Sequence, residues 1–271
     1  MSKISMGFIG YGNMAQAIAK GLVKEKVISP ENIYACAKHY DKLVLNTQKL
    51  GINPCENAED VVRKADMIII AVKPYQIEEV VGPLGNVLIG KIVVSVAAGY
   101  TFDKYEKILP EGVHHISTNP NTPIEVGAGI IACEEHHNLS EDELRLFYQI
   151  FEPIALIEMV ETSKLSIAGT ICGCTPAYTA MYMEALADAA VKHGLPRQSA
   201  YRMVAQMIYG TGKLYLETET HPGIMKDKVC SPNGTTIKGV ASLERDGFRG
   251  AVISAIDAAE NKNEYRNIVI I

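Results

Sequence analysis

A Gly-x-Gly-x-x-Ala motif near the start of the chain, formed by Gly10, Gly12 and Ala15, carries the strongest sign of chemistry in the sequence. A short apolar run precedes it, and a helical pattern begins directly after it, at Asn13 and Met14. Gly10 permits a tight turn, Gly12 leaves room for a phosphate beside the backbone, and Ala15 allows close packing of helix on strand. The free N–H groups at the helix start favour negative charge, so the motif predicts a site for the pyrophosphate of a dinucleotide.

The end of the second predicted strand bears on which dinucleotide binds. NAD-specific sites usually carry Asp or Glu there, which accepts hydrogen bonds from a ribose 2′-hydroxyl. Here the strand ends at Cys36 without an acid, and Lys38, His39 and Lys42 follow, which would suit a 2′-phosphate. This favours NADP(H) and leaves NAD(H) open, because Lys38 and Lys42 would also be ordinary solvated charges at a helix start.

A second group of residues that suits an anion lies at 231–236. Gly234, Thr235 and Thr236 stand where a loop runs into a helical pattern, and the free N–H groups at a helix start form a carboxylate site. An ordinary helix N-terminus capped by Ser231 or Thr235 would give the same pattern. This stretch alone leaves both interpretations open.

Strand-sized apolar runs alternate with helical patterns in the first part of the chain. The runs 67–72 and 92–96 lack two-residue alternation, which is typical of strands buried on both faces of a parallel sheet. Ser140 and Glu143 form a capping box before one helical stretch. The alternation predicts a doubly wound α/β domain. The expected strands are 3–9, 32–36, 67–72, 92–96, 113–117, 129–133 and 155–159, and the expected helices are 13–24, 41–50 and 141–151.

The pattern changes after about residue 162. Helical stretches at 179–193, 197–218 and 248–261 follow, with no strand run of comparable length. We therefore expect a dinucleotide-binding domain over 1–162 and an all-α domain over 163–271. The first of these helices is apolar on every side and must be buried in a core or against another subunit. This favours a homodimer over a monomer whose helices are covered by the first domain.

Composition excludes several function classes. The 271 residues carry a formal net charge of −5 and no long basic run, which disfavours nucleic acid and membrane surfaces as partners. No apolar run is as long as a membrane span, and no leader pattern precedes the first strand. Six cysteines without a Cys-x-x-Cys pair indicate reduced thiols in a cytoplasmic protein. The histidine pairs at 114–115 and 136–137 lack metal-ligand spacing, and 134–138 is expected to be a solvated loop, so no metal site is predicted.

Blocks that occur together in one protein family are spread along the sequence. They are residues 7–15, 71–74, 95–99, 120–123, 176–178 with 184–189, 194–197, 221–223 and 231–244, and the last, with its Gly-Thr-Thr core, is the most specific. In this order they resemble pyrroline-5-carboxylate reductase over nearly the full length of the chain. The resemblance implies a Rossmann domain, an all-helical dimerisation domain, an active site near the dimer interface, and often rings of dimers.

The family reaction transfers a hydride from NAD(P)H to the imine carbon of 1-pyrroline-5-carboxylate, giving L-proline in the last step of proline biosynthesis. By position, the resemblance implies that the Thr236 hydroxyl is the catalytic group, hydrogen-bonded to the ring nitrogen. The carboxylate pocket would consist of Ser231, Gly234, Thr235 and Thr236. The cofactor would lie against Gly10, Gly12, Asn13, Met14, Asn57, Ala71, Val72, Lys73, Pro74, Ala97 and Ala98.

The sequence departs from the family in two places. Residues 117–119 are Ser-Thr-Asn where members usually have Arg-x-Met, and residues 172–175 are Cys-Gly-Cys-Thr where they usually have Ser-Gly-Ser-Gly. Both departures are expected near the active site or its walls. They keep two alternatives open, a paralogous NADPH-dependent reductase of another small imino or keto acid, and a non-catalytic nucleotide-binding paralogue. The intact Gly-Thr-Thr core argues against the second.

Overall fold

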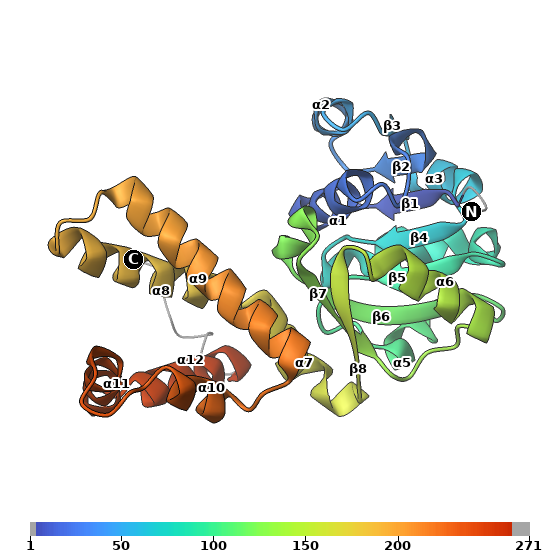
Figure 1. Cartoon of the computed structure of the whole chain (residues 1–271). Helices are drawn as coiled ribbons and strands as arrows, with labels where there is room; N and C mark the ends of the chain where they lie inside the picture. The colour runs from blue at the N-terminus through green and yellow to red at the C-terminus, as the bar shows by residue number, and fades with distance from the viewer. Residues whose placement is uncertain (1–3, 262–271) are drawn as a thin grey trace, which may run out of the picture. The chain divides into compact units, whose positions relative to one another are not determined.

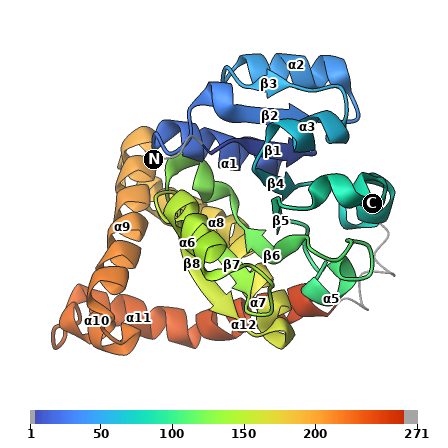
Figure 2. The same ribbon diagram turned by 90° about the vertical axis from the view of Figure 1, so that its right-hand side faces the viewer.

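Eight strands form one sheet in the computed structural model, which describes residues 4–261. Their order is β3-β2-β1-β4-β5-β6-β7-β8, and neighbours run parallel except for the antiparallel pair β6 and β7. Figures 1 and 2 show β2, β1, β4, β5 and β6 side by side in this order. The strands are β1 (Met6–Ile9), β2 (Ile33–Cys36), β3 (Asn53–Pro54), β4 (Met67–Ile70), β5 (Ile92–Ser95), β6 (His114–Pro120), β7 (Gly129–Glu134) and β8 (Ala155–Val160). The first six strands have the 3-2-1-4-5-6 order of a dinucleotide-binding domain, with its switch point between β1 and β4.

All seven predicted strands are present, with some ends shifted. Strand β1 begins at Met6, and residue 3, where the predicted strand began, lies outside the described residues. Ala71, Val72 and Val96 were predicted as strand residues but lie beyond the ends of β4 and β5, where the chain turns into loops. The two-residue strand β3 was not predicted, because it is too short to show a period.

The sheet is buried on both faces, which explains the continuous apolar runs. In β4, Met67 and Ile69 join one core cluster while Ile68 and Ile70 join the other. Helices α1 and α6 contribute to the first cluster, and α3, α4 and α5 contribute to the second. The helices of this part are α1 (Asn13–Lys24), α2 (Tyr40–Gln48), α3 (Ala58–Lys64), α4 (Ile77–Val81), α5 (Phe102–Tyr105), α6 (Glu141–Phe151) and α7 (Leu165–Gly173). Short 3₁₀ turns are η1 (Pro30–Asn32), η2 (Pro74–Gln76), η3 (Gly82–Leu88), η4 (Thr122–Val126) and η5 (Thr162–Lys164).

Local contacts explain the start of helix α6 and the packing of helix α1. The predicted capping box of α6 is confirmed, since Ser140 Oγ accepts the Glu143 N–H and Glu143 Oε2 accepts the Ser140 N–H. Helix α1 packs so closely on η4 that a Cβ at Gly21 would lie 2.3 Å from the Ile124 carbonyl oxygen. Helix α1 begins at Asn13 and ends at Lys24, as predicted.

The chain divides into two compact units between Gly173 and Cys174. Helix α7 belongs to the first unit, where hydrogen bonds join it to strand β6 and to Asn121, just beyond that strand. Asn119 Nδ2 donates to the Leu165 carbonyl at 3.1 Å, and Asn121 Nδ2 donates to the Cys172 carbonyl at 3.2 Å. Each of these hydrogen bonds joins residues more than forty positions apart, so no local sequence pattern predicts them.

The second unit is entirely helical over its described residues, as predicted. Its helices are α8 (Thr175–Lys192), α9 (Arg197–Thr218), α10 (Pro222–Lys228), α11 (Thr235–Arg245) and α12 (Phe248–Glu260). Helices α8 and α9 pack against each other, and the ion pair of Arg197 with Asp188 closes the turn between them. Among the described residues of this unit only Ala187 and Ala200 are fully buried, while Met181, Met203 and Ile253 are more than 60% exposed. Within residues 4–261, no helix is both long enough and apolar enough to cross a membrane.

Candidate functional site

A cavity of about 940 Å³ lies at the carboxyl ends of β1, β2, β4 and β5. This is the edge of a doubly wound sheet at which ligands bind, next to the switch point between β1 and β4. The structure brings all the predicted cofactor residues together here: Gly10, Gly12, Asn13, Met14, Asn57, Ala71, Val72, Lys73, Pro74, Ala97 and Ala98 line the cavity. Sequence reasoning missed other lining residues, among them Glu56, Gln76, Glu79 and Thr122.

The glycine turn has the geometry that a pyrophosphate needs. Gly10 has φ +92°, and a Cβ there would lie 2.8 Å from the Ala71 backbone, so only glycine fits. Apart from its two neighbours in the chain, a Cβ on Gly12 would meet nothing within 4 Å, so the space beside this residue is open. Gly12 is the N-cap of α1, and no side chain caps that helix. The N–H groups at the start of α1 are therefore available to an anion.

The end of β2 gives the cavity one positive and one neutral group. Lys38 lines the cavity, whereas His39 and Lys42, the other predicted partners of a 2′-phosphate, do not. Burial raises the pKa of the Cys36 thiol to about 11, so this lining residue is a neutral thiol near pH 7. Glu56 also lines the cavity and adds an acid that the predicted end of the second strand lacked.

Asn57 lines the cavity and also caps a helix. Its Oδ1 accepts the Asp60 N–H at 2.9 Å, and its Nδ2 donates to Asp60 Oδ2 at 3.0 Å. The amide is thus already engaged at the start of α3. The predicted contact of Asn57 with an adenine ribose stays a prediction, and the cap is a second role that the sequence did not show.

Two loops complete the wall on the β4 and β5 side. After β4, η2 is closed by the Gln76 N–H, which donates to the Lys73 carbonyl at 2.8 Å, so Gln76 enters the cavity wall together with Lys73. After β5, the Ala97 N–H donates to Ser95 Oγ at 3.2 Å, and the Tyr100 N–H donates to the Ala97 carbonyl at 3.2 Å. These bonds hold Ala97 at the cavity.

The predicted carboxylate residues lie at the start of α11 in the second unit. Gly234 is the N-cap of this helix, no side chain caps it, and Thr235 and Thr236 are its first residues. The expectation that the Gly234 N–H is free is wrong, because it donates to the Ser231 carbonyl at 3.0 Å in a tight turn. Ser231 and Thr235 do not cap the helix either. Thr235 and Thr236 are exposed, and their N–H groups stand at the first turn, where a helix leaves donors unpaired.

The two departures from the family pattern lie in the sheet and around α7. Ser117 and Thr118 are buried in β6, and Thr118 Oγ1 donates to the Ser95 carbonyl at 2.7 Å. Cys172 is buried, and burial raises the pKa of its thiol. None of residues 117–119 or 172–175 lines the cavity of the first unit.

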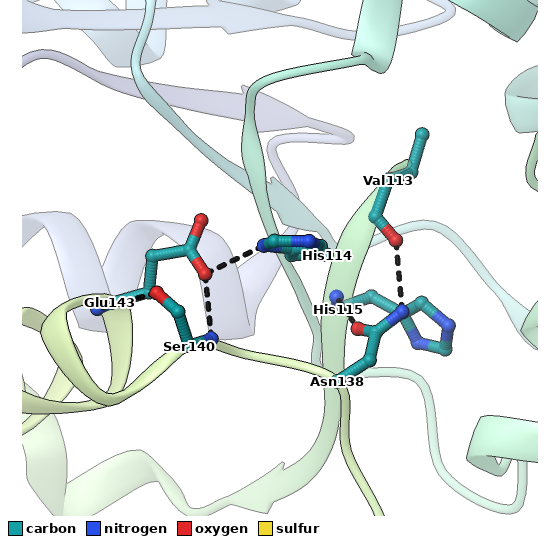
Figure 3. A network of polar contacts seen from close by, with 6 residues as sticks. All are labelled: Val113, His114, His115, Asn138, Ser140 and Glu143. Carbon is teal, nitrogen blue, oxygen red and sulfur yellow. Dashed lines mark hydrogen bonds and ion pairs between the residues drawn. The ribbon is translucent and has the colours of Figure 1, made fainter. Parts of the chain in front are cut away.

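His114, the first residue of β6, connects this strand to the start of α6. His114 Nδ1 lies 2.7 Å from Glu143 Oε2, the oxygen that also accepts the Ser140 N–H (Figure 3). Burial acts to raise the pKa of Glu143, but the Ser140 hydrogen bonds and His114 together lower it. Within residues 4–261, no group of three or more His, Cys, Asp or Glu side chains is arranged to hold a metal ion.

The expectation of a solvated loop at 134–138 is wrong for two residues. Asn138 Oδ1 accepts the His115 N–H at 2.6 Å, and its Nδ2 donates to the Val113 carbonyl at 3.0 Å (Figure 3). Asn138 thereby pairs backbone groups at the start of β6 that β7 does not reach. Glu134 is fully buried at the end of β7. The residues that Asn138 binds lie more than twenty positions away in the sequence, so the polar run at 134–138 gave no sign of these contacts.

Comparison with known proteins agrees with this geometry. Residues 162–265 match the family described as pyrroline-5-carboxylate reductase dimerisation, and residues 5–99 match the family described as NADP oxidoreductase coenzyme F420-dependent. Pyrroline-5-carboxylate reductase of Treponema pallidum is 41% identical over 260 residues, covering 94% of this chain and 98% of that protein. The reductase of Escherichia coli is 38% identical, covering 96% and 97%.

A solved structure extends the likeness to three dimensions. Pyrroline carboxylate reductase of Plasmodium falciparum, with NADP bound, superimposes with a TM-score of 0.84 at 29% identity, covering 96% of each chain. The predicted resemblance is therefore confirmed over both units. With two curated relatives above one-third identity across almost the whole sequence, the chain belongs to the pyrroline-5-carboxylate reductase family.

Proposed function

We propose that this chain reduces 1-pyrroline-5-carboxylate to L-proline with NADPH, the last step of proline biosynthesis. The observation that carries the proposal is the 41% identity to a pyrroline-5-carboxylate reductase over 94% of the chain. A hydride adds to the imine carbon of the protonated ring, and the proton stays on nitrogen, so the product is a secondary amine. A protonated imine is already an electrophile, and the protein needs chiefly to place the two reactants.

The cavity of the first unit fits the cofactor. NADPH, when bound, supplies the hydride. The open space at Gly12 and the uncapped start of α1 suit a pyrophosphate, and Lys38 suits a 2′-phosphate. Ala97 and Ala98 offer a small, apolar wall for the nicotinamide. NADH is a second possible donor, and in this proposal it binds more weakly because it leaves Lys38 without a partner.

The start of α11 fits a carboxylate. Thr235 and Thr236 offer backbone N–H groups at the positive end of an eleven-residue helix. Because Gly234 donates to the Ser231 carbonyl, Gly234 shapes this turn instead of binding the anion itself. The exposed Thr236 hydroxyl is proposed to hydrogen-bond the ring nitrogen, since it can donate or accept as the imine becomes an amine.

The second unit is proposed to form a homodimer, as a single dimer or as a ring of dimers. Its large apolar residues are exposed, including Met203, Met207 and Tyr209, which line one groove along α9. A surface of this kind needs a partner. All six cysteines are free thiols, which supports a reducing compartment and hence a cytoplasmic enzyme.

The test is reduction of synthetic 1-pyrroline-5-carboxylate, followed as loss of NADPH, together with growth of a reductase-deficient cell without proline. Turnover and restored growth are expected. Turnover of a different imino or keto acid alone would replace the substrate assignment, and binding of NADPH with no turnover would show a non-catalytic paralogue. Thr236→Ala should lower kcat on the order of ten- to a thousand-fold, more than it raises KM, while Thr235→Ala keeps its N–H and stays near the parent.

A further inference from the structure

A buried carboxylate that the proposed reaction does not use lies at the end of β7. Glu134 is 0% exposed, and its two oxygens accept hydrogen bonds from different parts of the chain. Oε2 accepts the Phe102 N–H at 2.7 Å, and Oε1 accepts the Thr162 hydroxyl at 2.8 Å. Taking a carboxylate out of water is costly, and an apolar side chain would fill this position more cheaply. The presence of a carboxylate at this buried position therefore points to a role for its two hydrogen bonds.

The Phe102 bond fixes one end of a loop that lines the cavity. Phe102 begins α5, and loop 97–101 lies between Phe102 and Val96, the first residue after β5. At the other end of this loop, Ser95 Oγ accepts the Ala97 N–H. The loop is thus held between two buried acceptors, Ser95 and Glu134.

The Phe102 side chain is itself confined. Its ring stacks on the His115 imidazole with centroids 4.4 Å apart, and the His136 ring lies 4.1 Å away on a tilted plane. Phe102 therefore has little freedom to follow a partner that moves. Because Glu134 accepts the backbone N–H of Phe102, a change at Glu134 acts directly on the backbone at the end of the loop.

The Thr162 bond ties the same carboxylate to the segment after β8. Thr162 begins η5, which runs directly into α7. Helix α7 is fixed on β6 by the hydrogen bond from Asn119 to the Leu165 carbonyl. Glu134 thus joins the cavity loop to a rigid part of the unit.

We propose that Glu134 is a positioning residue, which holds loop 97–101 at the place that the nicotinamide of the cofactor requires. Glu134 does not line the cavity, and it reaches the loop through its hydrogen bond to the Phe102 N–H. The inference rests on the proposed function for its kinetic effect, but its effect on cofactor binding is independent of the substrate. A displaced wall of about 1 Å near reacting groups is enough to slow a reaction on the order of a hundredfold.

The test compares three variants of Glu134 in the full-length protein. Glu134→Gln keeps both bonds, because its oxygen accepts the Phe102 N–H and its NH₂ donates to the Thr162 hydroxyl. Glu134→Leu removes both at similar volume. Glu134→Asp is one methylene too short to reach both donors. It still tests the role of the two hydrogen bonds if the Leu variant does not fold. Asn138→Leu is the control, since it removes two half-buried hydrogen bonds to the backbone of residues 113 and 115, and neither bond involves the loop.

Two readouts separate positioning from stability. The first readout is the fluorescence of bound NADPH, which is excited at wavelengths that no protein side chain absorbs and therefore gives its Kd. The second readout is kcat with NADPH and with NADPH deuterated at the transferred position. We expect the Leu and Asp variants to raise Kd and to lower kcat by about tenfold or more, with a larger isotope effect, while Gln stays within about twofold of the parent.

The outcomes are distinct. Asn138→Leu should lower Tm and leave Kd and the isotope effect unchanged. If the Leu and Asp variants behave like that control, Glu134 only stabilises the fold and the inference is overturned. Loss of kcat in Glu134→Gln equal to that in Glu134→Leu would also overturn it, because the bonds survive in Gln. Failure of the parent to reduce pyrroline-5-carboxylate would refute the proposed function, and the Kd series would still decide the role of Glu134.

Discussion

Replacing Gly12 with Val should abolish cofactor binding and leave the fold intact. Apart from its two neighbours in the chain, a Cβ at this position meets nothing within 4 Å, and the backbone, at φ −81° and ψ −167°, suits a β-branched residue. The stability cost should be about 1 kcal/mol, the usual loss when an N-cap residue is replaced by an apolar one. Tm should therefore fall by only a few degrees.

The effect on binding should be much larger. The Val side chain would occupy the open space in front of the first N–H groups of α1, where the pyrophosphate is proposed to bind. Loss of two hydrogen bonds to a charged group costs about 3–6 kcal/mol in total. This corresponds to an increase in the Kd for NADPH of about a hundredfold to ten-thousandfold. A fluorescence titration with NADPH measures it, and thermal unfolding with and without NADPH gives an independent check, because a bound ligand raises Tm.

Gly10→Val is the contrasting variant. Gly10 has φ +92°, and its Cβ would meet the Ala71 backbone at 2.8 Å, so this change should lower Tm strongly. The reasoning fails if folded Gly12→Val binds NADPH with near-parent affinity, since the phosphate site would then lie elsewhere. It fails in its structural part if Gly12→Val does not fold.

Three further predictions concern specificity, pH and assembly. Lys38→Ala should lower the ratio of kcat/KM for NADPH over NADH by up to about fivefold, as expected for the loss of one exposed charge pair. Lys42→Ala, outside the cavity, should leave the ratio unchanged. His115→Gln should flatten the fall in Tm between about pH 7 and pH 5. Burial lowers the pKa of His115 in the folded chain below 6.5, although Glu106 opposes this shift. Below that pH the unfolded chain binds a proton that the folded chain does not, so the parent loses stability as the pH falls. Small-angle scattering at micromolar concentration should show a dimer or a multiple of dimers, and a monodisperse monomer would contradict the proposed assembly.

The sheet could be read from the sequence because its signal is local. The runs around Ile68 and Val93 are apolar at every position, and only burial on both faces explains such a pattern. The glycine turn could also be predicted from the sequence, since Gly10 and Gly12 act through their own backbone. The seven strands and the long helices followed from these periods, and only their ends shifted.

The rest depended on contacts between distant segments. Glu134 and Asn138 stand in a polar run that looks solvated, but Glu134 binds Phe102 and Thr162, and Asn138 binds the Val113 carbonyl. The lining residues Glu56, Gln76 and Thr122 have no spacing that would single them out. The boundary predicted at 162–163 stays a prediction, since the compact units divide after Gly173 whereas the dimerisation family begins at residue 162.

The helical unit, in which only Ala187 and Ala200 are fully buried among the described residues, has a thermodynamic consequence. Two alanine side chains supply almost no transfer free energy, so this unit gains only a small hydrophobic core from its own residues. In the proposed homodimer, its folding and its association are one equilibrium. The transition temperature of these helices should then rise with protein concentration, whereas that of the α/β unit should respond mainly to NADPH. Dilution and cofactor removal therefore act as separate means of unfolding the two halves of one polypeptide.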